Sequence, residues 1–267
     1  MGEEGLSSKT IVSRNGHLLF GVGSLHRLPF RSQRARILRQ ALDLGFRHFD
    51  VAPAYGNGLN ELELGLALQG HRATCQVTTK FGIPVNLYGA HFPVLFPLVR
   101  GIRRLVDYQY GAEYRRRVLS PAEMTRSLEG SLQRLRRDCV DDFMIHEPLD
   151  ILTTAEIADL HETASRLKDQ GKIIRWGVCG PPTSIGQFVR DPGFDVFQFP
   201  LDAVDEVNLQ SPRRKIGYGV YRSYASSHRS IQVSFPVFVS DRMKKLSMDL
   251  IIATNSCTNL TLFRECL

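Results

Sequence analysis

The 267-residue sequence has no long apolar stretch. Its longest apolar run, Phe92 to Val99, has eight residues, includes two prolines and ends at Arg100, whereas a membrane-spanning helix needs about twenty. The N-terminus carries Glu3 and Glu4 and no apolar segment typical of a secretory signal. We therefore expect no membrane partner.

Cysteine is scarce as well, with five residues that are widely spaced and form no C-x-x-C pair: Cys75, Cys139, Cys179, Cys257 and Cys266. An odd number without such a pair argues against a disulfide framework and against a zinc site. We expect no bound metal, and we expect the reducing cytoplasm as the location.

Acidic residues are fewer than basic ones, 27 against 34, which gives a net charge of +7. This surplus would suit a nucleic acid, but the sequence has neither zinc-finger spacing nor an aromatic RNP-type motif, so no nucleic-acid partner is expected. Lysine contributes only 7 of the basic residues and arginine 27. We interpret the arginine excess mainly as a coding bias.

Linkers rich in Ser, Gly or Pro are also missing, and short apolar runs alternate with amphipathic stretches. Strands are expected at residues 19–22, 47–51, 75–80, 140–145, 173–179, 194–199, within 216–221, and at 250–253. Helices are expected over residues 32–44, 60–69, 120–135 and 153–168. Parallel neighbours need crossover connections, and eight such units fit about 250 residues. The pattern predicts an α/β fold, a single (β/α)8 TIM barrel over residues 1–267.

Local signals mark where several helices begin and end. Ser120, Pro121 and Glu123 supply an N-cap, a first-turn proline and a capping-box glutamate. Thr153 begins the next long helix in the same way, and Gly171 ends it. Asn60 is the expected N-cap of the second helix. A Rossmann fold is disfavoured because the turn after the first strand lacks the third glycine of that motif.

Four residues follow the expected strands where a barrel carries its active site. Asp50, Lys80 and His146 stand at the carboxyl ends of three strands, and Tyr55 lies in the loop after Asp50. A lysine inside a barrel mouth needs a charged partner, and Asp50 on the adjacent strand is the expected one. An ammonium is also compact enough to lie beside a phenol.

Several ordered motifs resemble the aldo-keto reductases, and the resemblance covers residues 11–265. The second-strand signature is matched by LRQALDLGFRHFDVAPAYG at residues 38–56. Further matches are ELELGLAL at 61–68, VTTK at 77–80, SLEGSLQRLRRDCVDDFMIHEP at 127–148 and GKIIRWGVCG at 171–180. Within the family, the sequence is most similar to the sugar and aldose dehydrogenases.

This resemblance implies roles for the four residues. Tyr55 matches the proton donor to the substrate carbonyl, and Lys80 matches the residue that lowers the pKa of that tyrosine. Asp50 matches the partner of the lysine, and His146 matches the residue that orients the carbonyl. A phenol has a pKa near 10, and a nearby cation stabilises its phenolate. Hydride would come from a nicotinamide cofactor, because no side chain supplies one.

The resemblance also implies a set of cofactor-binding residues. Gln198 matches the family's carboxamide-binding glutamine, and the segment after the last strand matches the one that holds the adenosine phosphate end. The family prefers NADP, but Thr254 and Leu260 stand where NADP-preferring members carry Lys and Arg, so NAD stays open. The predicted cofactor-binding residues are Gly23, Ser24, Gln198, Tyr221, Arg222, Thr254, Asn255 and Ser256.

Two departures from the family concern substrate specificity. Residues 81–119 form an unusually long connection after the third strand, rich in tyrosine, phenylalanine and arginine. It is either a surface excursion or an insert at the catalytic face that forms a pocket wall and recognises an acidic or phosphorylated substrate. The chain also stops early in the last helix, so this short C-terminus leaves specificity to the insert.

The leading hypothesis is an NAD(P)-dependent oxidoreductase that interconverts a carbonyl and an alcohol on a small polar or sugar-like substrate. A second is a Schiff-base lyase or aldolase with Lys80 as nucleophile and Asp50 and Tyr55 as acid–base partners. A third is a non-catalytic cofactor-binding subunit.

Overall fold

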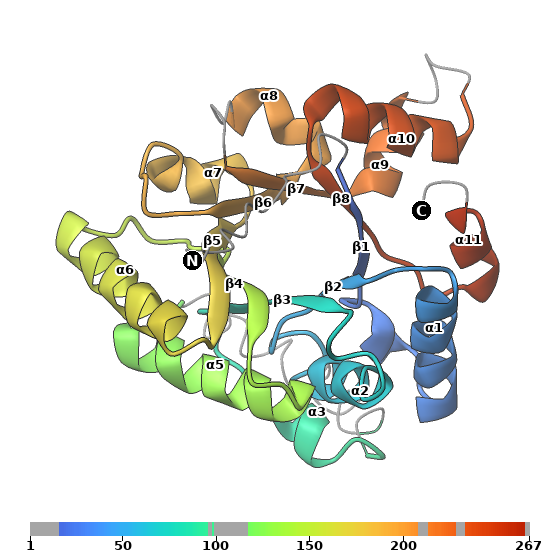
Figure 1. Cartoon of the computed structure of the whole chain (residues 1–267), viewed down its shortest axis with the longest axis horizontal. Coiled ribbons are helices and arrows are strands. Elements are labelled where there is room, and N and C mark those ends of the chain that lie inside the picture. Colours follow the sequence, from blue (N-terminus) through green and yellow to red (C-terminus); the bar gives the residue numbers. More distant parts are fainter. Residues whose placement is uncertain (1–15, 96–97, 99–116, 208–212, 228–232, 265–267) are drawn as a thin grey trace, which may run out of the picture.

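A computed structural model describes residues 16–95, 98, 117–207, 213–227 and 233–264. Eight parallel strands pair in chain order, and β1 pairs with β8 to close a barrel (Figure 1). The predicted (β/α)8 fold is confirmed. The strands are β1 (Leu18–Gly21), β2 (His48–Asp50), β3 (Gln76–Phe81), β4 (Val140–His146), β5 (Ile173–Cys179), β6 (Val196–Pro200), β7 (Arg214–Tyr218) and β8 (Asp249–Ile252).

Helices surround this ring of strands (Figure 1). They are α1 (Arg31–Asp43), α2 (Leu59–Ala67), α3 (Tyr88–His91), α5 (Pro121–Leu135), α6 (Thr154–Asp169), α7 (Pro182–Ile185), α8 (Val204–Val207), α9 (Val220–Ser227), α10 (Phe235–Leu246) and α11 (Cys257–Thr261), with the 3-10 turns η1 (Leu25–Arg27), η3 (Gly186–Phe188) and η4 (Leu201–Ala203). No helix in the described part of the chain is long and apolar enough to cross a membrane.

Both predicted N-caps form, but the reciprocal capping box forms only at Thr153, because the Glu123 carboxylate accepts from Arg126 instead. Ser120 accepts a hydrogen bond from the backbone N–H of Glu123 at 3.2 Å, with Pro121 in the first turn of α5. Thr153 and Glu156 form a reciprocal capping box at the start of α6. These contacts satisfy N–H groups that a helix start leaves unpaired. Their partners are three residues apart, so the sequence alone can predict them.

The prediction that Asn60 caps α2 is wrong. Gly58, in the left-handed region with φ of 84°, is the N-cap, and Asn60 lies inside the helix. The buried Asn60 amide donates to the carbonyl of Val22 at 2.6 Å and so ties α2 to the end of β1. A glycine can begin the helix here because it adopts positive φ at little cost.

The seventh strand ends earlier than predicted. β7 stops at Tyr218, Gly219 turns the chain with φ of 74°, and α9 begins at Val220. Tyr221 and Arg222 therefore lie in the first turn of α9 and not at the end of a strand. The apolar pattern alone does not reveal this turn, because it continues from the strand into the helix.

The predicted insert is only partly described. Most of the arginines assigned to an acidic or phosphorylated substrate lie within residues 99–116, which are outside the described residues, as are residues 96–97. Arg117 is the one of these arginines that is described. Beyond them, the backbone N–H of Val118 donates to the carbonyl of Gly82 at 2.9 Å. The two ends of the excursion therefore meet directly after β3.

Side chains alternate between the outside and the inside of the barrel, as the two-residue period of a strand requires. On β4, Phe143 and Ile145 pack outward in the main apolar core, while Met144 belongs to a small cluster inside. The side chains of Asp142 and His146 point into the barrel, on the same face of the strand as Met144. His146 thus stands at the carboxyl end of the barrel, and Asp142 lies deeper.

A charged network surrounds Asp142 in that deeper part. Its carboxylate contacts Arg175, lies 2.8 Å from Arg214 and 3.3 Å from His48, and accepts from Thr78. Burial opposes ionisation of Asp142, yet Arg214, His48 and Arg175 together hold its pKa well below the usual range. The amino-terminal half of the barrel interior is therefore held by ion pairs.

Candidate active site

Lys80 and Asp50 form a buried ion pair at the mouth of the barrel. The Lys80 ammonium lies 2.7 Å from Asp50 Oδ1 and donates to the carbonyl of Val51 at 3.1 Å. The lysine is 0% exposed and the aspartate 4%. Burial acts to lower the pKa of Lys80, but the Asp50 carboxylate outweighs it and raises that pKa, so Lys80 stays charged.

Tyr55 and His146 stand above this pair. The turn after β2 places the Tyr55 ring centroid 5.2 Å from Lys80 Nζ. The rings of Tyr55 and His146 meet edge to face, with centroids 5.5 Å apart and an interplanar angle of 87°. The structure thus brings together all four residues that the sequence singled out, although they come from three strands and a loop.

The electrostatics of the site keep the phenol protonated. Burial raises the pKa of the Tyr55 hydroxyl well above its usual value, while the Lys80 cation acts in the opposite direction. The lowering expected from Lys80 is therefore present but outweighed by burial. Burial, Lys80 and Arg117 each lower the pKa of His146 well below its usual value, so its imidazole is neutral.

A cavity of about 680 Å³ opens above these residues. Asp50, Tyr55 and His146 line it together with five of the predicted cofactor-binding residues, namely Gly23, Gln198, Tyr221, Arg222 and Thr254. Tyr221 is 73% exposed, and the Arg222 guanidinium reaches the exposed Asp202 at 3.2 Å. These two residues therefore stand at the rim of the cavity.

The other three predicted cofactor-binding residues do not line the cavity. The Ser24 hydroxyl donates to Asn255 Oδ1 at 2.9 Å, and the Asn255 amide donates back to the Ser24 carbonyl at 3.1 Å. This reciprocal pair joins the loops after β1 and β8. Ser256 caps α11 by accepting from the backbone N–H of Asn259. Their side chains support the loops next to the cavity.

The buried side chain of Gln198 presents one oxygen as a hydrogen-bond acceptor at the cavity. Its amide nitrogen donates to Asp50 Oδ1 at 3.1 Å, which fixes the orientation of the side chain. Its oxygen, Oε1, is buried and has no hydrogen-bond partner among the described residues. Since a buried acceptor without a partner is costly, this oxygen fits a ligand group that donates an N–H, such as a carboxamide.

Tyr218 and Glu147 are among the residues that line the cavity but that the sequence did not single out. Tyr218 is the last residue of β7, and its side chain points into the barrel like that of Ile216. A correctly predicted end of this strand would therefore have placed Tyr218 at the cavity. Glu147 follows His146 directly, and no local pattern distinguishes it. Cys179 also lines the cavity, and burial raises the pKa of its thiol to about 12, which fits the packing role expected for it.

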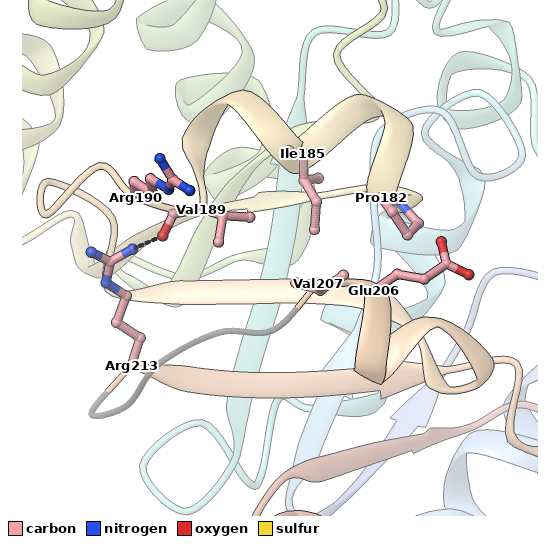
Figure 2. Close-up of a pocket in the computed structure, with 8 residues that line it drawn as sticks. Pro182, Ile185, Val189, Arg190, Glu206, Val207 and Arg213 are labelled. Atoms are coloured by element: carbon pink, nitrogen blue, oxygen red, sulfur yellow. Dashed lines mark hydrogen bonds between the residues drawn. The ribbon is translucent and has the colours of Figure 1, made fainter.

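Figure 2 shows another cavity, of about 560 Å³, between α7 and α8. Arg190 and Arg213 stand at one side, and Arg213 donates to the carbonyl of Val189 at 2.8 Å. This second cavity is not lined by Asp50, Tyr55, Lys80 or His146. Within the described residues, no group of three His, Cys, Asp or Glu side chains is arranged to hold a metal ion.

The fold and the site define a (β/α)8 barrel with Tyr55, His146 and the Lys80–Asp50 pair clustered at its carboxyl end. The sequence model of the Aldo/keto reductase family matches residues 17–201, and the chain belongs to that family.

Three similar proteins agree with this assignment. L-galactose dehydrogenase of Arabidopsis thaliana is 28% identical over 198 residues, which are 72% of this chain and 50% of the relative, so the chain spans about half of its length. The aldo-keto reductase AKR11C1 from Bacillus halodurans has a TM-score of 0.67 at 18% identity, covering 94% of this chain and 86% of its own. An aldo-keto reductase from Klebsiella pneumoniae in complex with NADPH has a TM-score of 0.63 at 19% identity, covering 94% and 84%.

Proposed function

We propose that this protein is an NADP-dependent oxidoreductase that interconverts a carbonyl and an alcohol on a small polar or sugar-like substrate. The observation that carries the proposal is the cluster of Tyr55, His146 and the Lys80–Asp50 pair beneath one cavity. Membership in the family supports the reaction type. The NADPH complex of the Klebsiella pneumoniae protein supports the cofactor, and the similarity to L-galactose dehydrogenase supports a sugar-like substrate.

The cofactor, when bound, would supply the hydride. Gln198 would hold its carboxamide, because Oε1 is a buried acceptor without a partner. Gly23, Tyr221, Arg222 and Thr254 line the same cavity and would contact the rest of the cofactor. Ser24, Asn255 and Ser256 would shape the loops at its phosphate end. The position where NADP-preferring members carry a lysine is a threonine here, Thr254, so NAD is the alternative to NADP.

Tyr55 would donate the proton. During reduction the hydroxyl of Tyr55 would give its proton to the carbonyl oxygen, and the tyrosine would become a phenolate. The Lys80 ammonium stabilises that phenolate, and Asp50 keeps the lysine charged. During oxidation the phenolate would accept the proton of the substrate hydroxyl. The raised pKa keeps Tyr55 in the protonated form that reduction requires.

His146 would orient the carbonyl. Its neutral imidazole lies against the Tyr55 ring and carries one N–H that can donate to the same oxygen. A neutral donor polarises the carbonyl without repelling the nearby Lys80 ammonium. His146 therefore complements Tyr55.

The Schiff-base alternative finds little support in this geometry. A lysine nucleophile must lose its proton, yet Lys80 is fully buried and is held as a cation by Asp50. A non-catalytic cofactor-binding subunit would need no acid–base group, whereas here all four residues are in contact range.

Titration with NADPH and NADH, followed by nicotinamide fluorescence, tests the proposal first. Absorbance at 340 nm with small hydroxyaldehydes and polyols then measures turnover. We expect the protein to bind NADPH, and we expect turnover when cofactor and substrate are both present. Tight binding without turnover would favour the non-catalytic subunit, and borohydride trapping of a substrate on Lys80 would favour the lyase.

A further inference from the structure

Glu147 holds an unusual backbone conformation next to His146. Its φ is 49°, in the left-handed region that side chains other than glycine rarely adopt. Two hydrogen bonds fix it there. Its N–H donates to the carbonyl of Cys179 at 2.7 Å, and its own carbonyl accepts from Arg117 Nε at 2.9 Å. Residues held this way cluster at ligand sites, so Glu147 merits a functional explanation.

Arg117 also holds the side chain of Glu147. Its Nη2 lies 3.4 Å from Glu147 Oε2, and the Arg117 side chain is only 9% exposed. The neighbouring backbone is anchored, because Val118 donates to Gly82. The arginine therefore clamps both the backbone and the carboxylate of Glu147 from outside the cavity.

The carboxylate of Glu147 acts on the cavity itself. Glu147 lines the cavity with Tyr55 and His146, and its side chain is 44% exposed. Burial is the main cause of the raised pKa of the Cys179 thiol and of the Tyr218 hydroxyl, which also line the cavity, and the Glu147 charge adds to both shifts. A substrate placed at Tyr55 would therefore experience this negative charge.

Among the described residues, no other charge that lines the cavity compensates it. Arg117, the partner of Glu147, is not part of the cavity lining, so the Glu147 carboxylate is the nearer charge for a group inside the cavity. Lys80 and Asp50 neutralise each other, and the His146 imidazole is neutral. Arg222 stands at the rim with Asp202 as its partner. An anionic group beside Glu147 would be repelled, whereas a hydroxyl would donate a charge-assisted hydrogen bond. Because Arg117 already pairs with the carboxylate, a neutral donor suits it better than a second cation.

We propose that Glu147 is a specificity-determining residue: clamped by Arg117, its carboxylate accepts hydrogen bonds from the hydroxyl groups of a polyhydroxylated carbonyl substrate and repels substrates that carry carboxylate or phosphate. The inference rests on the proposed function and narrows its substrate class. It opposes the acidic or phosphorylated substrate predicted from the arginines of the insert.

Oxidation of NADPH with three small aldehydes tests the inference. Glyceraldehyde carries hydroxyls, succinic semialdehyde carries a carboxylate, and butyraldehyde carries neither and serves as the reference. The wild-type protein should prefer glyceraldehyde to succinic semialdehyde. In Glu147→Gln, the ratio of kcat/KM for glyceraldehyde over succinic semialdehyde should fall by about tenfold or more, mainly through KM, since the acceptor loses its charge.

Two further variants keep the result interpretable. Glu147→Asn tolerates positive φ and should shift the ratio in the same direction even if Glu147→Gln folds poorly. Glu162→Gln, an exposed position on α6, is the matched control and should leave the ratio unchanged. A wild-type preference for succinic semialdehyde, or an unchanged ratio in active folded Glu147 variants, overturns the inference alone. Absence of turnover with all three aldehydes and with the polyols overturns the proposed function itself.

Discussion

The carboxylate of Asp50 supports Lys80 and also Gln198. Its Oδ1 accepts from the Lys80 ammonium at 2.7 Å and from the Gln198 amide at 3.1 Å. One buried oxygen therefore positions the cation beneath Tyr55 and the amide proposed to hold the cofactor. Under the proposed function, this shared partner would link proton transfer to cofactor orientation, and each can be tested separately.

The role of Tyr55 is tested by Tyr55→Phe, which removes only the hydroxyl. We expect kcat to fall at least about 100-fold, because the proton donor is lost. NADPH affinity, measured by nicotinamide fluorescence, should stay close to the wild-type value. If binding and turnover fell in parallel, the assigned role would be contradicted.

Lys80→Met should damage turnover at least as much as Tyr55→Phe. The phenolate loses its cation, and Asp50 is left as a buried charge without its main partner, which we expect to lower the free energy of unfolding by about 3–5 kcal/mol. Lys172→Met is the matched control, because that lysine pairs with Glu129 at the surface. Its effect in urea unfolding should stay within about 1 kcal/mol. Near-normal rates in folded Lys80→Met would refute the ion-pair account.

Gln198→Leu separates cofactor binding from proton transfer. The substitution removes the buried acceptor Oε1, so the dissociation constant for NADPH should rise about tenfold. Fluorescence titration measures this, with Gln133→Leu on the exposed face of α5 as the control. Unchanged NADPH affinity in Gln198→Leu would show that the cofactor does not use this amide.

The ion pairs around Asp142 predict a dependence of stability on pH. Because the native pKa of Asp142 is depressed, its contribution is complete above the unfolded value of about 3.9 and is lost as the pH falls through the native pKa. Asp142→Asn should therefore lower the free energy of unfolding by about 3–5 kcal/mol at pH 7. In urea titrations from pH 7 to pH 3 the difference should shrink towards the acid end.

The exposed Asp159 on α6 offers a control for that titration. Asp159→Asn should change stability little at any pH, since its side chain is exposed. A difference between Asp142→Asn and the wild type that stayed constant down to pH 3 would argue against a depressed pKa of Asp142.

Local sequence determined much of the fold. The alternation of strands and helices, the caps at Ser120 and Thr153, and the positions of Asp50, Lys80 and His146 at strand ends follow from short-range patterns. Such patterns suffice because a strand end or a capping box is decided by a few consecutive residues. The same reasoning failed at Asn60, whose amide serves a distant carbonyl, and at β7, where one glycine ends the strand.

Tertiary structure alone decided how distant side chains meet. Closure of the barrel places Asp142 of β4 against Arg214 of β7, and the return of the chain after β3 places Arg117 beside Glu147. It also lets burial outweigh Lys80 in setting the pKa of Tyr55. These outcomes depend on register, depth and desolvation, which no window of neighbouring residues contains. The sequence thus determined which groups are available for the chemistry, and the closed barrel decided which of them touch.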